Sequence, residues 1–288
     1  MPPLDFRGRR LGRPYGLTPD LTVGEGLTFR DAATREPVAI KGMRPRRFSS
    51  DVITIGASGQ ALRSLRFETH SGFAIGTLSL WQSNALAVYR LNVSDESGRR
   101  PWNNRAMPVT LMTGNARFPF ELPVPVFLPS MRSLQYDLAE TAAQAGDVQL
   151  TFEGFEVVSD HPDGALLELV ASRTFFAYGY QLTIGAGVGT INENDLLMEL
   201  DAPFQLLAIN SDIRTGWRAQ FHSTRQSWFA TNNRTAIENL AGDGQRPGWV
   251  STPLRLAKNE VWHTQTENLI AGAQTPEVLL LGMKLWDE

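Results

Sequence analysis

An internal repeat is the feature of this 288-residue sequence that most constrains its fold. Thr54-Ile55-Gly56-Ala57 recurs as Thr183-Ile184-Gly185-Ala186, and Asn103-Asn104-Arg105 recurs as Asn232-Asn233-Arg234. The two motifs start 49 residues apart in both halves of the chain. A shared spacing between separate motifs indicates that one structural unit was duplicated and then diverged.

A third landmark closes each copy of the repeat. A Pro-x-x-Leu motif is followed by a glycine 29 residues after its proline: Pro125, Leu128 and Gly154 in the first copy, and Pro253, Leu256 and Gly282 in the second. Before Gly154, Val148, Leu150 and Phe152 alternate with other residues, which is typical of a strand with one buried face. We interpret the shared glycine as a bulge or a close approach of two backbones.

The repeat predicts an all-β protein. Each copy contains roughly eight short segments of strand character, separated by turns. The 25 Gly and 17 Pro suit many turns, and no segment sustains the apolar spacing of an amphipathic helix. We therefore expect two tandem antiparallel β-sandwiches. A jelly roll is the preferred form and an immunoglobulin-like sandwich the alternative, because strand number does not fix connectivity.

The predicted organisation has four parts. Residues 1–50 form a basic extended arm, 51–157 the first sandwich, 158–180 a structured linker and 181–288 the second sandwich. An arm rich in Arg, Pro and Gly does not order by itself. We expect it either to add a strand to the edge of the first sandwich or to reach another subunit. The short linker predicts sandwiches that pack against each other.

Charge is distributed unevenly along the chain. Residues 1–50 hold ten basic and five acidic residues, a net charge of +5, so the remaining 238 residues carry −8 within the overall −3. A basic arm on an acidic body can bind a polyanion or the body of a neighbouring copy, whereas the overall balance argues against a nucleic-acid partner. The candidate assembly residues are Arg7, Arg9, Arg10, Arg13, Arg44, Arg46 and Arg47.

No pattern in the sequence predicts a catalytic, metal or cofactor site. The four histidines form no His-x-His pair of the kind that duplicated cupin enzymes use for metal, and no Gly-x-Ser-x-Gly motif is present: His70, His161, His222 and His263. The acidic residues between 190 and 201 lack the spacing of a calcium loop, so we interpret them as a solvated turn and strand face. Gly185–Gly189 is interpreted as a hairpin turn that needs positive φ rather than as a nucleotide loop.

The aromatic residues leave two interpretations open. Seven tryptophans either fill cores and interfaces, which we prefer, or include a platform for stacking on sugars: Trp81, Trp102, Trp217, Trp228, Trp249, Trp262 and Trp286. The absence of cysteine favours assembly in a reducing compartment, and we expect neither a signal peptide nor a membrane-spanning segment.

A duplicated sandwich with a basic arm, no cysteine and no export signal resembles the virion structural proteins of viruses and bacteriophages that have tandem, double-jelly-roll-like domains. The resemblance is one of architecture and covers residues 51–288. It implies a non-enzymatic capsid, decoration, adaptor or baseplate component that binds copies of itself and other virion proteins. It also implies a virion location after assembly in the host cytoplasm. The alternative function is a carbohydrate- or receptor-binding module.

Overall fold

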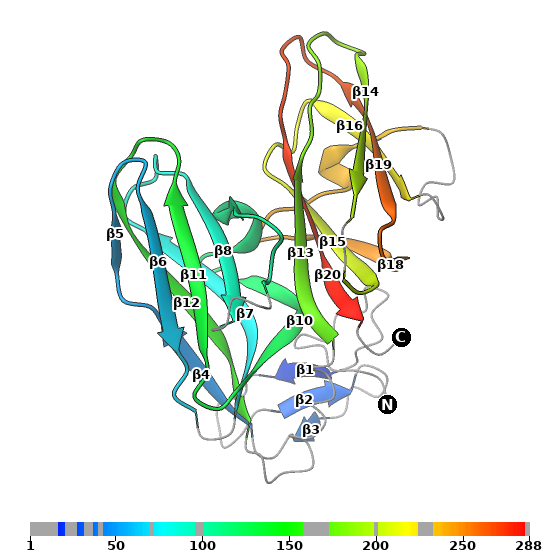
Figure 1. Cartoon of the computed structure of the whole chain (residues 1–288). Coiled ribbons are helices and arrows are strands. Elements are labelled where there is room, and N and C mark those ends of the chain that lie inside the picture. Colours follow the sequence, from blue (N-terminus) through cyan, green and yellow to red (C-terminus); the bar gives the residue numbers. More distant parts are fainter. Residues whose placement is uncertain are drawn as a thin grey trace.

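The computed structural model of the chain contains two β-sandwiches that lie side by side, with a small sheet near the base of the first (Figure 1). The structure describes residues 17–20, 28–31, 37–39, 43–69, 72–95, 101–157, 173–198, 201–223 and 233–285. Within these residues, helix is limited to α1 (Val109–Met112) and the 3-10 turn η1 (Ile237–Asn239). The predicted all-β fold class is therefore confirmed.

The first sandwich is built from two antiparallel sheets. One has the order β10-β7-β12-β4, with β5 also paired to β12. Its strands are β4 (Met43–Ser49), β5 (Ile53–Ile55), β7 (Gly72–Gln82), β10 (Phe120–Pro129) and β12 (Gly146–Val157). The other has the order β6-β11-β8-β9. Its strands are β6 (Gln60–Arg66), β8 (Tyr89–Asp95), β9 (Met107–Pro108) and β11 (Ser133–Glu140).

The second sandwich is also built from two antiparallel sheets. One has the order β13-β20-β15-β18 and contains β13 (Arg173–Gln181), β15 (Phe204–Ser211), β18 (Gly248–Leu256) and β20 (Glu277–Leu285). The other has the order β14-β19-β16-β17 and contains β14 (Ile191–Leu197), β16 (Trp217–Ser223), β17 (Thr235–Ala236) and β19 (Val261–Asn268). A separate sheet joins β1 (Leu17–Asp20), β2 (Thr28–Asp31) and β3 (Pro37–Ala39).

The two sandwiches share one strand order. With β4 and β5 counted as one strand, each sandwich pairs its first, eighth, third and sixth strands in one sheet. Its second, seventh, fourth and fifth strands form the other sheet. This arrangement is the jelly roll, in which two Greek keys wrap around each other. The structure therefore bears out the jelly roll rather than the immunoglobulin-like alternative.

Alternating side chains explain why these segments form sandwich strands. Buried and more exposed residues alternate along β11, β16 and β19, so each of these strands presents one face to the core. Large aromatic residues fill both interiors, among them Phe73 and Phe152 in the first and Trp217 and Trp262 in the second. Burial of such side chains is the main favourable term in the stability of each sandwich.

The two glycines that close the repeat lie opposite equivalent bulges. The register of β12 against β7 shifts at Gly154, and the register of β20 against β15 shifts next to Gly282. A Cβ atom at Gly154 would come within 1.9 Å of the Ala74 carbonyl oxygen, and one at Gly282 within 2.0 Å of the Gln205 carbonyl oxygen. The expected close approach of two backbones is present at both glycines.

The glycines that open the repeat behave differently. Gly56 and Gly185 precede their turns, but neither has a positive φ angle. In the second copy the left-handed residues are Gly187 and Gly189, with φ values of 102° and 81°, and in the first copy Ser58 takes this conformation, with φ 54°. The glycine-rich segment is therefore a turn that leads into β14, as predicted, and not the start of a helix.

Both halves also share a turn whose recurrence, though not its turn character, was missed in the sequence. Asn115 Oδ1 accepts hydrogen bonds from the backbone N–H groups of residues 117 and 118, at 2.9 and 2.8 Å. Asp243 Oδ1 accepts from those of residues 245 and 246, at 2.9 and 2.8 Å. Each turn follows a glycine, Gly114 or Gly242. The backbone carbonyl of Phe118 or Arg246 lies so close to that glycine that no side chain would fit there. The shared pattern Gly-Asn/Asp-x-x-x-Pro is visible in both halves and was the available signal.

The structure places two domain boundaries differently from the prediction. β4 lies within the predicted arm, yet it pairs with residues 151–157 of β12 and is the first strand of the first sandwich. β13 lies mostly within the predicted linker, yet all nine of its residues pair with β20. Both are edge strands. An edge strand tolerates the proline and arginines of β4 because one side of its backbone is outside the sheet.

Candidate functional site at the junction of the two sandwiches

One contact surface of the described residues lies where the two sandwiches meet. Residues 90–95 and 101–113 of the first sandwich and strand β10 face the outer side of the sheet that contains β13 and β20, and Figure 1 shows β10 beside β13. We call this contact the junction. The sandwiches therefore pack together, as the short linker predicted, and the junction is the candidate functional site because it fixes their relative position.

The centre of the junction is apolar. The first sandwich's core continues into the second through Phe175, Ala177, Ala208, Leu279 and Leu281, all of which have an exposed fraction of zero. β20 is consequently buried on both faces, whereas the equivalent β12 alternates. Full burial of each leucine side chain contributes about 1.5–3 kcal/mol, so this shared core makes the junction permanent. The unbroken run Val278-Leu279-Leu280-Leu281 was the sequence signal for this two-sided burial.

The repeated asparagines extend the junction along the edge of β13. Asn103 holds its own loop, since its Nδ2 atom donates to the Leu91 carbonyl oxygen at 2.9 Å and its Oδ1 atom accepts from Val93 N at 3.1 Å. Asn104 reaches across to Gly179. Its Nδ2 atom donates to the Gly179 carbonyl oxygen at 3.0 Å, and Gly179 N donates to its Oδ1 atom at 2.7 Å.

Backbone pairing accompanies these side-chain bonds. Ala177 N donates to the Trp102 carbonyl oxygen at 2.7 Å, and residues 103 and 177 form a parallel bridge. The loop therefore acts as a short added strand that satisfies the open edge of β13. The recurrence of this motif in the sequence marked the loop. Asn103 bonds the backbone of its own sandwich, whereas Asn104 makes the contact with β13.

Among the described residues, the side chain of neither motif arginine joins the two sandwiches. Arg105 is exposed, and its carbonyl oxygen accepts a 2.6 Å hydrogen bond from Asn103. Arg234 Nη1 lies 3.8 Å from Glu267 Oε2, within its own sandwich. An asparagine amide offers one donor group and one acceptor, which matches a backbone N–H and C=O, whereas a guanidinium only donates. This difference explains why the asparagine makes the contact.

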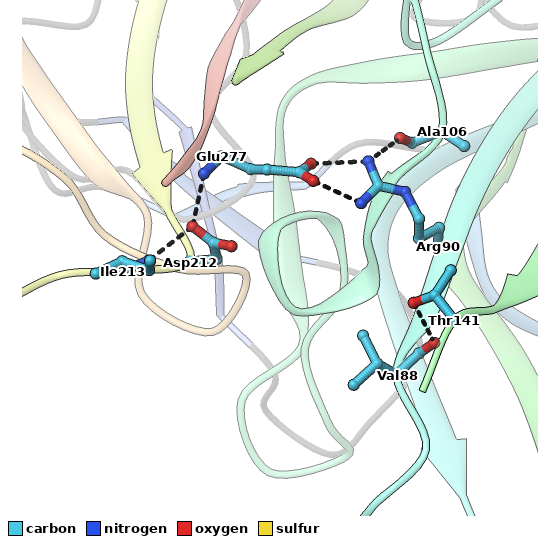
Figure 2. Close-up of polar contacts among 7 residues, drawn as sticks. All are labelled: Val88, Arg90, Ala106, Thr141, Asp212, Ile213 and Glu277. Atoms are coloured by element: carbon cyan, nitrogen blue, oxygen red, sulfur yellow. Dashed lines mark hydrogen bonds and ion pairs between the residues drawn. The ribbon is translucent and has the colours of Figure 1, made fainter. Parts of the chain in front are cut away.

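An ion pair closes the junction at the start of β20. Arg90 Nη1 lies 2.6 Å from Glu277 Oε1 and Arg90 Nη2 lies 2.8 Å from Glu277 Oε2, a bidentate arrangement that Figure 2 shows. Arg90 Nη2 also donates to the Ala106 carbonyl oxygen at 2.8 Å. The two charged residues are 187 positions apart in sequence, so no local pattern could have predicted their pairing.

Asp212 orients the residue that carries this carboxylate. Its Oδ1 atom accepts from Glu277 N at 2.8 Å and from Ile213 N at 2.7 Å (Figure 2). Desolvation raises the pKa of Asp212, and the negative charge of Glu277 acts in the same direction, while the two backbone N–H groups oppose the shift. Asp212 therefore positions the backbone of Glu277, and its raised pKa means that its charged form is disfavoured in the folded chain.

Two glycines allow the sandwiches to approach closely. A Cβ atom at Gly179 would lie 2.1 Å from Met107 Sδ, and one at Gly244 would lie 2.1 Å from the Thr113 carbonyl oxygen. Gly244 N donates to the Thr110 carbonyl oxygen at 2.7 Å, and Asn210 Nδ2 donates to that of Leu111 at 2.8 Å. The end of α1 is thus satisfied by the second sandwich.

The structure describes the side chains of two of the seven predicted assembly arginines, Arg46 and Arg47. Arg7, Arg9, Arg10 and Arg13 lie outside the described residues, and Arg44 lies on β4 with its side chain undescribed. Arg46 Nε pairs with Glu156 Oε2 at 2.9 Å, and Arg47 Nη2 pairs with Glu153 Oε1 at 2.5 Å. Arg46 and Arg47 therefore belong to the first sandwich, where they bind its acidic β12.

The described residues contain one histidine pair that the sequence did not indicate. His222 and His263 stack with ring centroids 4.8 Å apart, and His263 Nδ1 lies 2.6 Å from Asp195 Oδ1. His70 and His161 lie outside the described residues. Within the described ranges, no group of three or more His, Asp or Glu residues is placed to hold a metal ion. None of the helices described there is long and apolar enough to cross a membrane.

The acidic segment around residue 195 lies along a strand. Glu193 accepts a hydrogen bond from Gln265, and Asp195 contacts His263, so each carboxylate has a separate partner on β19. Asp201 pairs with Lys284 at 2.6 Å, whereas Glu199 lies outside the described residues. The carboxylates that are described do not converge as calcium ligands do, which agrees with the predicted strand face.

Most of the described tryptophans are internal. Trp102, Trp217 and Trp262 are buried, Trp249 packs at the junction, and Trp81 is 52% exposed. Trp228 and Trp286 lie outside the described residues. Among the tryptophans that the structure describes, no exposed group forms a platform for a sugar.

Comparisons with known proteins return likenesses of fold alone. No protein-family model matches the chain, and no curated protein sequence matches it. The major capsid protein P2 of bacteriophage PM2 resembles it with a TM-score of 0.44 at 11% identity, over 85% of this chain and 99% of that chain. VP54 of PBCV-1, as fitted into a reconstruction of the virophage Sputnik, has a TM-score of 0.42 at 7% identity, over 84% and 93%. Infectious bursal disease virus VP2 has a TM-score of 0.27 at 7% identity, over 93% and 46%.

Proposed function

We propose that this chain is a non-enzymatic structural protein of a virus particle. It assembles through the faces of its two sandwiches and through its N-terminal arm, and it is located in the virion after assembly in the host cytoplasm. The observation that carries the proposal is the junction, where a shared apolar core, an added strand and a buried ion pair join two jelly rolls of one strand order.

A rigid two-domain block suits the construction of a shell. Repeated assembly requires that each subunit present its contact surfaces at fixed relative positions, because closed symmetry depends on a constant rotation from one subunit to the next. The junction supplies this constancy within one chain. Among virion components we favour a capsid building block over a decoration, adaptor or baseplate protein, since the chain holds two jelly rolls of one strand order at a fixed relative position.

The carbohydrate-binding alternative lacks a supporting observation in the described residues. Sugar recognition by a sandwich uses exposed aromatic rings that stack on the ligand, and Trp81 is the one described tryptophan with a largely exposed side chain. We therefore do not favour a glycan or receptor as the principal partner. The partners that we propose are further copies of the chain and other virion proteins.

Sedimentation velocity over a wide range of protein concentration tests the assembly role. We expect the full chain to form discrete oligomers as its concentration rises, and we expect deletion of residues 1–42, which leaves β4 intact, to weaken association. Limited proteolysis should show an arm that is protected in the oligomer. A full chain that stays monomeric at every concentration, with an arm that is cleaved equally at all of them, would contradict the proposal.

A further inference from the structure

The second sandwich carries its own copy of the surface that the first sandwich uses at the junction. Arg90 pairs in register with Pro108, immediately before α1, and Arg218 pairs with Ala236, immediately before η1. Arg218 therefore occupies the position of Arg90. Asn233 occupies the position of Asn104, because the Asn-Asn-Arg motif recurs at the corresponding place.

The two copies of this surface differ in occupancy. Arg90 and Asn104 bind the second sandwich of the same chain, as described above. Arg218 and Asn233 are exposed, and neither side chain makes a hydrogen bond or ion pair with another residue that the structure describes. The second sandwich thus presents a joining surface without an intramolecular partner in the described part of the chain.

The first sandwich presents the complementary surface on β4 and β12. Counting back from the bulge glycines, Thr151 corresponds to Leu279 and Gln149 to Glu277. Ser49 pairs with Thr151 on β12, and Gly179 pairs with Leu279 on β20. Ser49 is therefore the counterpart of Gly179, the residue that Asn104 binds. Ser49 is exposed, and it lies on an edge strand.

The chemistry of this second surface is polar where that of the junction is apolar. Leu279 and Leu281 are replaced by Thr151 and Glu153, and the Arg47 side chain that pairs with Glu153 is 68% exposed. Polar surfaces of this kind remain soluble in the separate subunit and associate in a salt-dependent manner. The apolar contact therefore holds one chain together, while the polar one is suited to reversible joining of chains.

We propose that the Arg218–Asn233 surface of one chain binds the outer side of β4 and β12 in a second copy, which repeats between chains the geometry of the junction. Asn233 binds the backbone of Ser49, and Arg218 donates to the side-chain oxygen of Gln149. This inference rests on the proposed assembly role and names the surfaces involved. Such a head-to-tail contact closes into a ring or extends as a filament, depending on its rotation.

Cysteine cross-linking tests the contact directly, because the natural chain contains no cysteine. Chains with Ser49→Cys are mixed with chains with Asn233→Cys and oxidised mildly. A disulfide requires Cα atoms about 4.4–6.8 Å apart, so we expect a covalent pair whose linked peptides carry both introduced cysteines. Lys258→Cys, on an exposed turn of the same sandwich, replaces Asn233→Cys in the control mixture and should give no such pair.

Charge reversal provides a second, independent readout. Arg218→Glu should raise the dissociation constant of self-association at least ~10-fold, whereas Lys258→Glu, an equal charge change at another exposed site, should leave it unchanged. Circular dichroism checks that both variants fold. If the wild-type chain associates but the cross-link does not form and Arg218→Glu associates normally, this contact is overturned while the assembly role stands. If the wild-type chain does not associate at all, both are overturned.

Discussion

Replacement of Arg90 by leucine is the sharpest test of how strongly the junction holds the two sandwiches. The Glu277 side chain is 9% exposed and receives both of its short bonds from Arg90, whose side chain is 22% exposed. Arg90→Leu leaves this carboxylate buried and without its cation. Loss of one partner from a buried ion pair costs about 3–5 kcal/mol, and the partial exposure of Arg90 places the expected loss near the lower limit, about 3 kcal/mol.

The double variant separates the ion pair from its surroundings. Arg90→Leu combined with Glu277→Leu removes both charges and leaves an apolar contact, which is often neutral relative to the buried pair. We therefore expect the double variant to lose no more than about 1 kcal/mol, which makes the two substitutions strongly non-additive. A structural role for Arg90 through packing alone predicts the opposite, that the two losses add.

Urea unfolding monitored by tryptophan fluorescence measures these free energies, because Trp102 and Trp249 lie at the junction. The shared core predicts a single unfolding transition for the wild-type chain, which permits a two-state treatment. A loss below about 1 kcal/mol for Arg90→Leu would refute the assignment of the pair as a main element of the junction. Two separate transitions in the wild-type chain would refute the shared core itself.

Three further substitutions test other parts of the account. Gly282→Ala should destabilise the fold by at least about 3 kcal/mol because its Cβ meets a carbonyl oxygen, whereas Gly272→Ala, with nothing within 4 Å, should be neutral or slightly stabilising in the same urea titration. Asn104→Ala should cost about 2 kcal/mol because it leaves the buried Gly179 N–H and C=O unpaired, and faster hydrogen exchange at Gly179 N is the specific readout. Asp212→Asn should stabilise the chain at neutral pH. Because the folded pKa of Asp212 is raised, its charged form lowers the free energy of unfolding at pH values above that pKa. This loss disappears below the ordinary carboxyl pKa near pH ~4, so the melting temperatures of the variant and the wild type should converge there.

The repeat spacing made the fold class predictable, because it combined strand alternation with recurring turn landmarks. The boundaries were less predictable, since edge strands obey weaker rules. β4 contains Pro45 and several arginines and so has the composition of an arm, although it pairs with β12. The common origin of the two halves stays a prediction, although their strand orders agree.

The junction was only partly visible in the sequence. The Asn-Asn-Arg motif marked its position, but the role of Asn104 depends on the edge of β13, which lies 75 residues away from it at Gly179. The pairing of Arg90 with Glu277 depends on how two domains dock and leaves no periodic trace. By contrast, Leu279 and Leu281 did leave one, because they interrupt the alternation that the equivalent β12 retains.

Electron microscopy of the concentrated, purified chain tests most directly whether this two-lobed block builds larger structures. The proposal predicts regular arrays or closed shells in which paired lobes, each the size of one jelly roll, recur at constant spacing. Micrographs that contain only isolated two-lobed molecules, from protein whose arm is intact and at concentrations up to its solubility limit, would contradict a role as a capsid building block.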